Sequence, residues 1–209
     1  TRPAGLWAPE CAFTPGMEVD YQRAGVTHFM VDGPSLHGDT ACGRPVGASD
    51  VVAFGRDLTV SYRVWSPKAG YPGHADYRDF HTYHHETGFK PARVTGRSVS
   101  PEHKAPYNPT RAAARVDHDV ADFVETVVGR LQSETERCGR PAHVVAAFDT
   151  ELFGHWWHEG PEWLGKVIRA LHAAGVRVGS LATARAAGYV GTPVELGDCS
   201  WGSGKDWRV

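Results

Sequence analysis

The sequence predicts an α/β fold in which parallel strands alternate with helices. Short apolar runs rich in β-branched residues, each bounded by glycine or polar residues, are separated by stretches whose apolar residues recur at helical spacing. The length of 209 residues, with 41% hydrophobic and 22% charged residues, is typical of one ordinary domain. In barrels and doubly wound folds of this kind, functional groups lie at the carboxyl ends of the strands.

Four apolar runs are predicted to be strands. Each is too short for a helix and contains valine, threonine or phenylalanine between polar or glycine boundaries. The predicted strands are Gly5–Pro9, Val26–Asp32, His143–Asp149 and Gly175–Thr183.

Helical spacing is found in four other stretches. The first opens with Pro15 and Gly16 and closes at Gly25, and the longest is an amphipathic stretch of many turns. The predicted helices are 15–25, 56–65, 110–137 and 161–174. The remaining long segment, Ser66–Pro109, is rich in Gly, Pro, His and Tyr with weak periodicity, which indicates a long loop over the active face. Loops of that length are usually functional or disordered.

Charge and cysteine content limit the classes of partner. A net charge of -2 and a pI near 6.6 argue against nucleic acid or a membrane surface, which require a basic face, so the expected substrate is neutral or small. No signal peptide or spanning segment is recognisable, although the start at Thr1 and the end at Val209 suggest an internal piece of a longer protein. A cytoplasmic location is predicted, because the four separated cysteines form no C-x-x-C pair: Cys11, Cys42, Cys138 and Cys199.

Two carboxylates are placed at the ends of predicted strands. Glu10 follows the strand that begins at Gly5, and Asp149 ends the strand that begins at His143. A pair of carboxylates on one rim is what cleavage of a glycosidic bond requires, since one attacks the anomeric carbon and the other protonates the leaving oxygen. The alternative is that Asp149 caps the following turn and Glu10 forms an ion pair.

Four longer motifs extend this hypothesis. The stretches "WAPECAFTPGME", "FGRDLTVSYRVWSPKAGYPGHADYRDF", "FDTELFGHWWHEGPEWL" and "CSWGSG" resemble glycoside hydrolase family 57, most closely its α-1,4-glucan branching enzymes. The resemblance spans nearly the whole chain in the correct order. It implies a partial (β/α)7 barrel with parallel strands and external helices, no metal or other cofactor, and a retaining double displacement on glycogen- or amylose-like α-1,4-glucans.

The resemblance also implies roles for individual residues. Glu10, in "PECA", matches the family nucleophile, and Asp149, which opens "DTELFGHWW", matches the general acid/base. The expected product is an α-1,6 branch when the 6-hydroxyl of a glucan attacks the covalent intermediate, and a free end when water attacks. The implied substrate-binding positions are Arg56, Trp65, Gly73, His155 and Trp201.

The chain departs from the family pattern in two ways. The link from Asp32 to Gly47 is short and contains no tyrosine, whereas branching members carry a longer insertion whose tyrosine covers the site. The first barrel strands and a following helical domain are also missing. Residues 1–209 are therefore expected to be the central and C-terminal part of a catalytic barrel domain, and the piece alone is expected to lack full activity.

Other functions compete with branching. An α-amylase or 4-α-glucanotransferase of the same family would use the same two carboxylates. A non-catalytic glucan-binding protein would use only the aromatic residues. A metal-dependent polysaccharide deacetylase would use histidine ligands, and the candidates are His81, His84, His85, His155 and His158, although their spacing does not form H-E-x-x-H.

Overall fold

The computed structural model describes residues 3–66 and 68–202. These residues form two compact units, each made from segments distant in the sequence. Unit 1 contains the described residues up to Leu58, then Gly129–Ala146 and the described residues from Gly179 onward. Unit 2 contains Thr59–Val128 and Ala147–Val178. Pro67, Ser203 and Gly204, which belong to two of the quoted motifs, lie outside the described residues.

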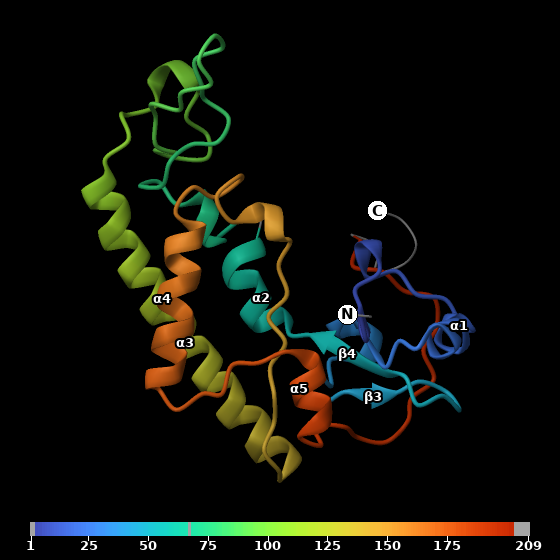
Figure 1. Ribbon diagram of the computed structural model, residues 1–209. Helices are drawn as coiled ribbons and strands as arrows, with labels where there is room; N and C mark the ends of the chain where they lie inside the picture. The colour runs from blue at the N-terminus through green and yellow to red at the C-terminus, as the bar shows by residue number, and fades with distance from the viewer. Residues whose placement is uncertain (1–2, 67, 203–209) are drawn as a thin grey trace. The chain divides into compact units, whose positions relative to one another are not determined.

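Unit 1 is built on a four-stranded sheet in the order β1-β2-β4-β3 (Figure 1). β1 (Gly5–Leu6), β2 (His28–Asp32) and β4 (Val52–Arg56) are parallel, and β3 (Arg44–Pro45) runs antiparallel to β4. All five residues of β2 and of β4 are buried, as expected for strands covered on both faces. The predicted strands at residues 5–9 and 26–32 are confirmed in shorter form, whereas β4 was not predicted.

The core of unit 1 lies between this sheet and α1 (Met17–Ala24). α1 ends at Gly25, whose φ of 78° is the left-handed conformation that glycine supplies at helix ends. A 3-10 turn, η2 (Gly33–Leu36), follows β2 directly. The buried core residues are Phe13, Tyr21, Phe29, Val31, Leu36, Val46, Val51, Ala53, Leu196 and Cys199.

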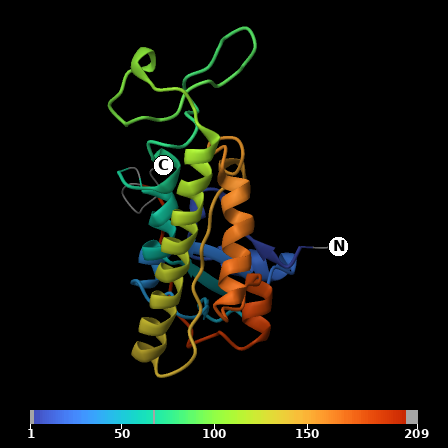
Figure 2. The ribbon, with the colours of Figure 1, turned by 90° about the vertical axis from the view of Figure 1, so that its left-hand side faces the viewer.

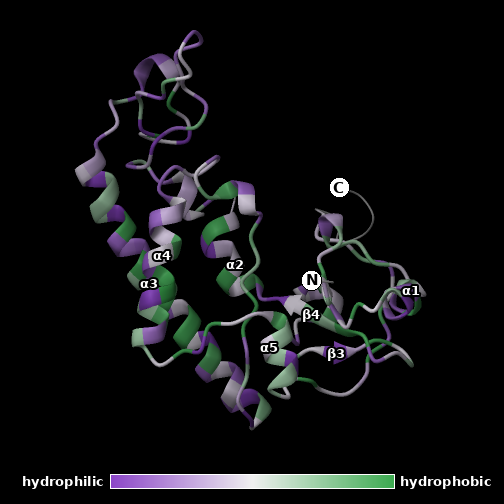
Figure 3. Cartoon of the chain, viewed as in Figure 1, coloured by the Kyte–Doolittle hydropathy of each residue, from purple (hydrophilic) through white to green (hydrophobic). Residues whose placement is uncertain are grey.

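Three of the predicted helices belong largely to unit 2, and all three are confirmed. They are α2 (Leu58–Trp65), α3 (Pro109–Cys138) and α4 (Gly160–Ala173). α3 and α4 run side by side in both ribbon views (Figure 1 and Figure 2). Hydrophobic and hydrophilic residues alternate along them (Figure 3), which is the stripe expected of helices with one buried face.

Aromatic rings fill the space between these helices and the preceding excursion. Trp163 of α4 is fully buried and meets Phe123 of α3 edge to face, with ring centroids 4.9 Å apart. Trp157 lies 5.1 Å from Trp163, and Tyr77 lies 5.4 Å from Trp157. The buried Tyr77 hydroxyl donates to Asp119 Oδ2 at 2.6 Å, so the polar end of this ring is satisfied.

The excursion of residues 66–109 has little regular structure but is internally tied. It contains two short 3-10 turns, η3 (Tyr71–Gly73) and η4 (Pro101–His103). Asp79, 3% exposed, accepts hydrogen bonds from Lys104 Nζ and from the backbone N–H of Thr82, both at 2.6 Å. This buried ion pair joins two points 25 residues apart in the chain.

Two predicted strands are wrong. Residues 143–149 are extended but pair through isolated backbone bonds only, from His143 N to Ala41 O at 3.1 Å and from Asp57 N to Val145 O at 2.9 Å. The apolar run there reflects the burial of Val145 and Ala147 and not the pairing of a regular strand. Residues 175–180 are irregular and mostly exposed, and α5 (Leu181–Ala186) then begins with Ser180 accepting a bond from the N–H of Thr183.

Candidate active site

Glu10 lies in a turn that β1 positions at the carboxyl end of the sheet. β1 ends at Leu6, and the 3-10 turn η1 (Pro9–Cys11) follows after two residues. Glu10 has φ 57° and Cys11 has φ 53°, so two successive non-glycine residues occupy the left-handed region. Each such residue costs on the order of 1–3 kcal/mol, and such strain clusters at functional sites.

Trp201 holds the Glu10 side chain through its indole. Its Nε1–H donates a hydrogen bond to Glu10 Oε2, and its backbone N–H donates to the Glu10 carbonyl at 2.8 Å. Trp7 meets the Trp201 ring edge to face at a centroid distance of 5.3 Å. Two contacts from one residue fix both the backbone and the carboxylate of Glu10, although the carboxylate itself stays exposed.

Arg56 lies on the same side of unit 1 and supports Trp201. Its guanidinium carbon is 4.7 Å from the centroid of the Trp201 ring, a cation–π contact. The same guanidinium is bound to Asp32, with Nε and Nη2 at 3.0 and 2.9 Å from Oδ1. Because β2 and β4 are parallel and in register, Asp32 and Arg56 are paired at the carboxyl ends of the two strands.

The Asp32–Arg56 pair is among the most buried charges in unit 1. The side chains are 0% and 6% exposed. A charge removed from water is costly unless it is paired, so loss of either partner of this pair is expected to be destabilising. Arg56 is thus held in place by Asp32, and its one described aromatic contact is with Trp201.

Two thiols lie beneath the Glu10 turn. Cys11 is fully buried, and burial raises the pKa of its thiol to about 12, although the Trp7 indole donates to its Sγ at 3.2 Å. Burial likewise raises the pKa of Cys199. Phe13 and Cys199 exchange two backbone hydrogen bonds at 2.9 and 3.0 Å, which brings residues 199–201 to the turn. Both thiols are therefore protonated packing groups.

The short link after β2 is packed on the sheet. A Cβ on Gly33 would lie 2.5 Å from the carbonyl oxygen of Arg56, so only glycine fits there. Thr40 donates to the buried Asp57 at 3.2 Å. By contrast, Gly38 has a φ of 79° and open space around the position of a Cβ. The link is anchored at Gly33 and Thr40 and is exposed at Gly38.

Asp149 belongs to unit 2 and precedes the 3-10 turn η5 (Thr150–Leu152). Its backbone carbonyl accepts a bond from Leu152 N at 3.1 Å, but its side chain makes no capping bond to the turn. The capping alternative for Asp149 is thus wrong. Among the ion pairs of the described residues none involves Glu10, whose carboxylate instead accepts the hydrogen bond from Trp201.

The other predicted binding residues of unit 2 lie at separate places. Gly73 lines a hollow of about 260 Å³ with Tyr71 and Arg97, and a Cβ on Gly73 would come 2.7 Å from the Arg97 guanidinium. His155 is exposed and lines a second hollow. Trp65 ends α2, and its buried Nε1 has no hydrogen-bond partner among the described residues.

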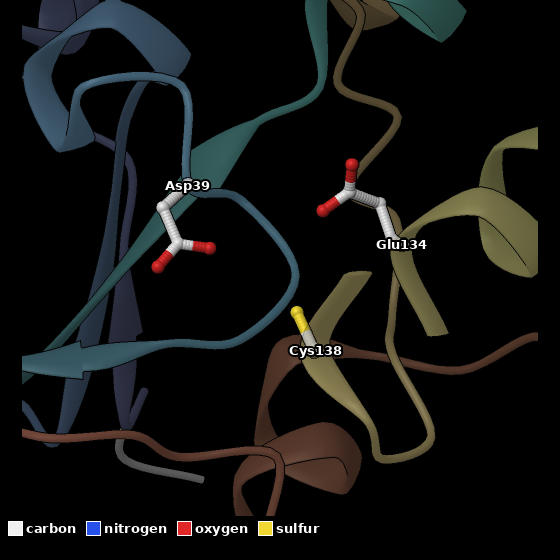
Figure 4. Close-up of side chains that lie close together, drawn as sticks. All are labelled: Asp39, Glu134 and Cys138. Carbon is white, nitrogen blue, oxygen red and sulfur yellow. The ribbon is translucent and has the colours of Figure 1, made fainter. Parts of the chain in front are cut away.

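The histidines of the deacetylase alternative do not form a ligand set. Across residues 3–66 and 68–202, the one group of three potential ligands is Asp39, Glu134 and Cys138 (Figure 4). Its carboxylates are already neutralised, since Arg137 Nη2 lies 2.6 Å from both Asp39 Oδ1 and Glu134 Oε2. Arg130 adds a further contact to Glu134 at 2.5 Å. These arginines explain the group as an ion-pair network.

Sequence reasoning missed two residues of the unit 1 site. Trp7 contacts both Trp201 and Cys11, and Asp32 holds Arg56. The position of each residue in the sequence could have identified it as a candidate site residue. Trp7 stands three residues before Glu10, and Asp32 is the polar residue that ends a buried strand, the place where functional groups of parallel sheets are found.

No family model matches the chain. Individual proteins do match it over its whole length. A probable 1,4-α-glucan branching enzyme of Mycobacterium tuberculosis, known from two strains, is 75% identical over 208 residues, which is 100% of this chain and 40% of that protein. The chain therefore spans about two fifths of the length of this curated relative.

Solved structures match as well. The crystal structure of a family 57 branching enzyme from Thermococcus kodakaraensis, in complex with glucose, has a TM-score of 0.92 and 31% identity, covering 99% of this chain and 44% of that one. The α-amylase AmyC from Thermotoga maritima has a TM-score of 0.83 and 27% identity, covering 98% and 45%. The predicted α/β class of a partial (β/α)7 barrel is confirmed by these matches.

Proposed function

Because this chain belongs to glycoside hydrolase family 57, we propose that it is the central and C-terminal part of the catalytic domain of a 1,4-α-glucan branching enzyme. The carboxylate of Glu10, held by the indole of Trp201 at the end of a parallel strand, is the observation that carries this proposal. The 75% identity over 208 residues to a protein named as a probable branching enzyme supports it.

The proposed mechanism is a retaining double displacement. Trp201 binds Oε2 of Glu10, which leaves Oε1 to attack the anomeric carbon of an α-1,4-glucan and form a covalent glycosyl-enzyme. Asp149 gives a proton to the departing oxygen and then accepts one from the incoming 6-hydroxyl. The 6-hydroxyl oxygen replaces the Glu10 oxygen at the anomeric carbon, so the enzyme returns to its starting state and the product carries an α-1,6 branch.

The remaining predicted residues act as binding groups in this proposal. Trp201 offers an aromatic face to a sugar, and Arg56 holds that ring from below while it is itself held by Asp32. Gly73, Trp65 and His155 supply the glucan contacts of unit 2. The histidines serve no metal, and the reaction as proposed uses no cofactor.

A direct test uses the full-length protein with amylose as substrate. New α-1,6 linkages, counted after debranching, are expected to accumulate without an equal number of new reducing ends. A crystal structure of that protein is expected to place the carboxyl groups of Glu10 and Asp149 about 5–5.5 Å apart, the separation found in retaining enzymes. Products without branches, or a separation beyond about 8 Å, would contradict the proposal.

Hydrolysis or chain transfer is the second candidate, favoured by the match to an α-amylase and by the short link from Asp32 to Gly47. Branching needs a covalent intermediate that is shielded until an acceptor glucan arrives, and covering loops are the usual means of excluding water. A short link from Asp32 to Gly47 is therefore expected to favour attack of water, and not of an acceptor glucan, on the covalent intermediate. The ratio of new reducing ends to new α-1,6 linkages decides between the two, with a large excess of linkages refuting the short-link reasoning.

The proposed setting is the cytoplasm, with a glycogen-like glucan as substrate and neither nucleic acid nor a membrane as partner. All four cysteines are unpaired in the structure, and three of them are buried, in keeping with a reducing compartment. Among the described residues, no helix is long and apolar enough to cross a membrane.

A further inference from the structure

Apart from His155, the residues that line a second hollow in unit 2 have no role in the chemistry described so far. The hollow has a volume of about 290 Å³ and lies between the excursion and the segment that follows Asp149. Its walls come from three short stretches, within residues 78–80, 88–90 and 154–158. That volume is near the lower end of the roughly 300–1,000 Å³ typical of ligand sites, so it suits a ligand the size of one or two sugar rings.

Exposed aromatic rings line this hollow. The Trp156 side chain is 42% exposed and that of Phe89 is 60% exposed. Phe80 packs behind Trp156 with ring centroids 4.4 Å apart, and the His155 ring lies 5.1 Å from Phe80. Phe80 and His155 thus contact the Trp156 ring, while Trp156 and Phe89 remain exposed.

The orientation of Trp156 is fixed by hydrogen bonds. Its indole Nε1–H donates to Glu151 Oε1 at 3.2 Å, so the ring is satisfied at its polar end. The next residue, Trp157, is only 1% exposed and belongs to the aromatic core. The core of unit 2 therefore uses one of the two adjacent tryptophans, whereas the other lies outside that core, beside Phe80 and His155, and is exposed.

Polar groups surround these rings. Lys90 Nζ lies 3.6 Å from the centroid of Phe80, and His158 also faces the hollow. Asp79, at the base, is held by the buried bond to Lys104. A flat apolar surface with polar groups at its edge matches a pyranose ring, which has an apolar C–H face and a rim of hydroxyls.

We propose that this hollow is a binding subsite for an α-1,4-glucan, in which a glucosyl unit stacks on Trp156 and Phe89 and Lys90 and His158 bond its hydroxyls. The inference rests on the proposed function, because it takes the glucan as the ligand. Asp149 lies seven residues before Trp156, so the subsite would contact the chain whose linkage Asp149 protonates. The subsite would strengthen the binding of long glucan chains and would take no part in bond formation.

The experiment measures binding and turnover of the full-length protein. Trp156→Ala and Phe89→Ala are compared with Tyr83→Ala, an aromatic residue of the same excursion that is 47% exposed and lies outside the hollow. Binding of amylose and of a short maltooligosaccharide is measured by calorimetry in a Glu10→Gln background, which removes turnover. Kinetic constants are measured in the active background.

Trp156→Ala and Phe89→Ala are each expected to weaken amylose binding roughly three- to tenfold, with a KM increase of the same size that exceeds any change in kcat. Tyr83→Ala is expected to bind as the parent does. If the parent makes branches and the two hollow variants bind amylose as tightly as Tyr83→Ala, this inference is wrong and the proposed function stands. If the parent neither binds nor alters glucans, the proposed function fails first.

Discussion

The two units carry the two proposed catalytic carboxylates in different ways. In unit 1, Glu10 is held by specific polar contacts, with Trp201 bound to its carboxylate and the buried Asp32–Arg56 pair behind Trp201. In unit 2, Asp149 precedes a short turn next to a core of packed aromatic rings. The Glu10 turn therefore depends on a few charged and hydrogen-bonded groups, whereas the turn that follows Asp149 lies next to apolar packing.

Removing each carboxylate is expected to have the largest effect and to separate the two roles. Glu10→Gln and Asp149→Asn should each lower branching at least about 10³-fold, because each removes an essential step. With an activated aryl glycoside, whose leaving group needs no proton, Asp149→Asn should still form the covalent intermediate while Glu10→Gln should not. Mass spectrometry of the trapped protein measures this, and equal trapping by both variants would refute the assignment.

The dependence of unit 2 on packing is tested at Trp163. Trp163→Ala removes a fully buried ring that contacts Phe123 and Trp157, and should lower the free energy of unfolding by about 3–5 kcal/mol. Ile168→Ala on the same helix is the control, because that side chain is 46% exposed and its loss should change the free energy by less than about 0.5 kcal/mol. Urea denaturation of the full-length protein measures both, and similar losses would show that α4 is not packed as described.

The dependence of unit 1 on one hydrogen bond is tested at Trp201. Trp201→Phe keeps a ring above Arg56 but removes the donor to Glu10, and a bond to a charged group contributes about 1.5–3 kcal/mol. We expect kcat/KM to fall roughly 10- to 100-fold. Trp7→Phe is the matched control, since the Trp7 indole donates to a thiol sulfur and not to the carboxylate. Equal effects of the two changes would show that ring packing, not the hydrogen bond, matters.

A smaller effect, dependent on pH, is expected from His143 of unit 1. Its ring lies against Phe54 and Tyr189, neither ring nitrogen has a partner among the described residues, and burial lowers its pKa to about 4. The unfolded chain, with a histidine pKa near 6.5, binds this proton more tightly, so stability is lost as pH falls from about 6.5 through about 4.

The full loss would be about 3 kcal/mol. His143→Phe should leave stability at pH 7 unchanged or slightly higher and should remove this part of the acid sensitivity. Thermal unfolding at pH 7 and at pH 4.5 measures the change. An acid-induced decrease as large in the variant as in the parent would show that other groups are responsible.

The difference between the two units also explains which helices and strands could be predicted from the sequence. The helices of unit 2 were predicted almost to the residue, because each carries an apolar stripe and depends on local spacing. β4 of unit 1 was missed because Gly55 interrupts an apolar run. The structure shows why glycine is needed there, since a Cβ would lie 2.9 Å from Thr40 and 3.0 Å from Leu36 of the covering link.

The candidate site of unit 1 also depends on contacts between residues that are distant in the sequence. Glu10 and Trp201 are 191 positions apart, and periodicity contains no information about the Phe13–Cys199 pairing that joins them. The family resemblance supplied both residues but assigned Arg56 to substrate binding. The structure adds that Arg56 is bound by Asp32, a contact set by the register of β2 and β4, which no local pattern reports.

The link after β2 also has a consequence for engineering. Gly33 and Thr40 are committed to the sheet, so an insertion beside either would disrupt the packing on Arg56 or the bond to Asp57. Gly38 is exposed, left-handed and surrounded by open space, which makes it the position where extra residues would disturb least. Under the proposed function, a longer loop transplanted at Gly38 is therefore the natural route for shifting the reaction from release of free sugar ends toward a more densely branched polymer.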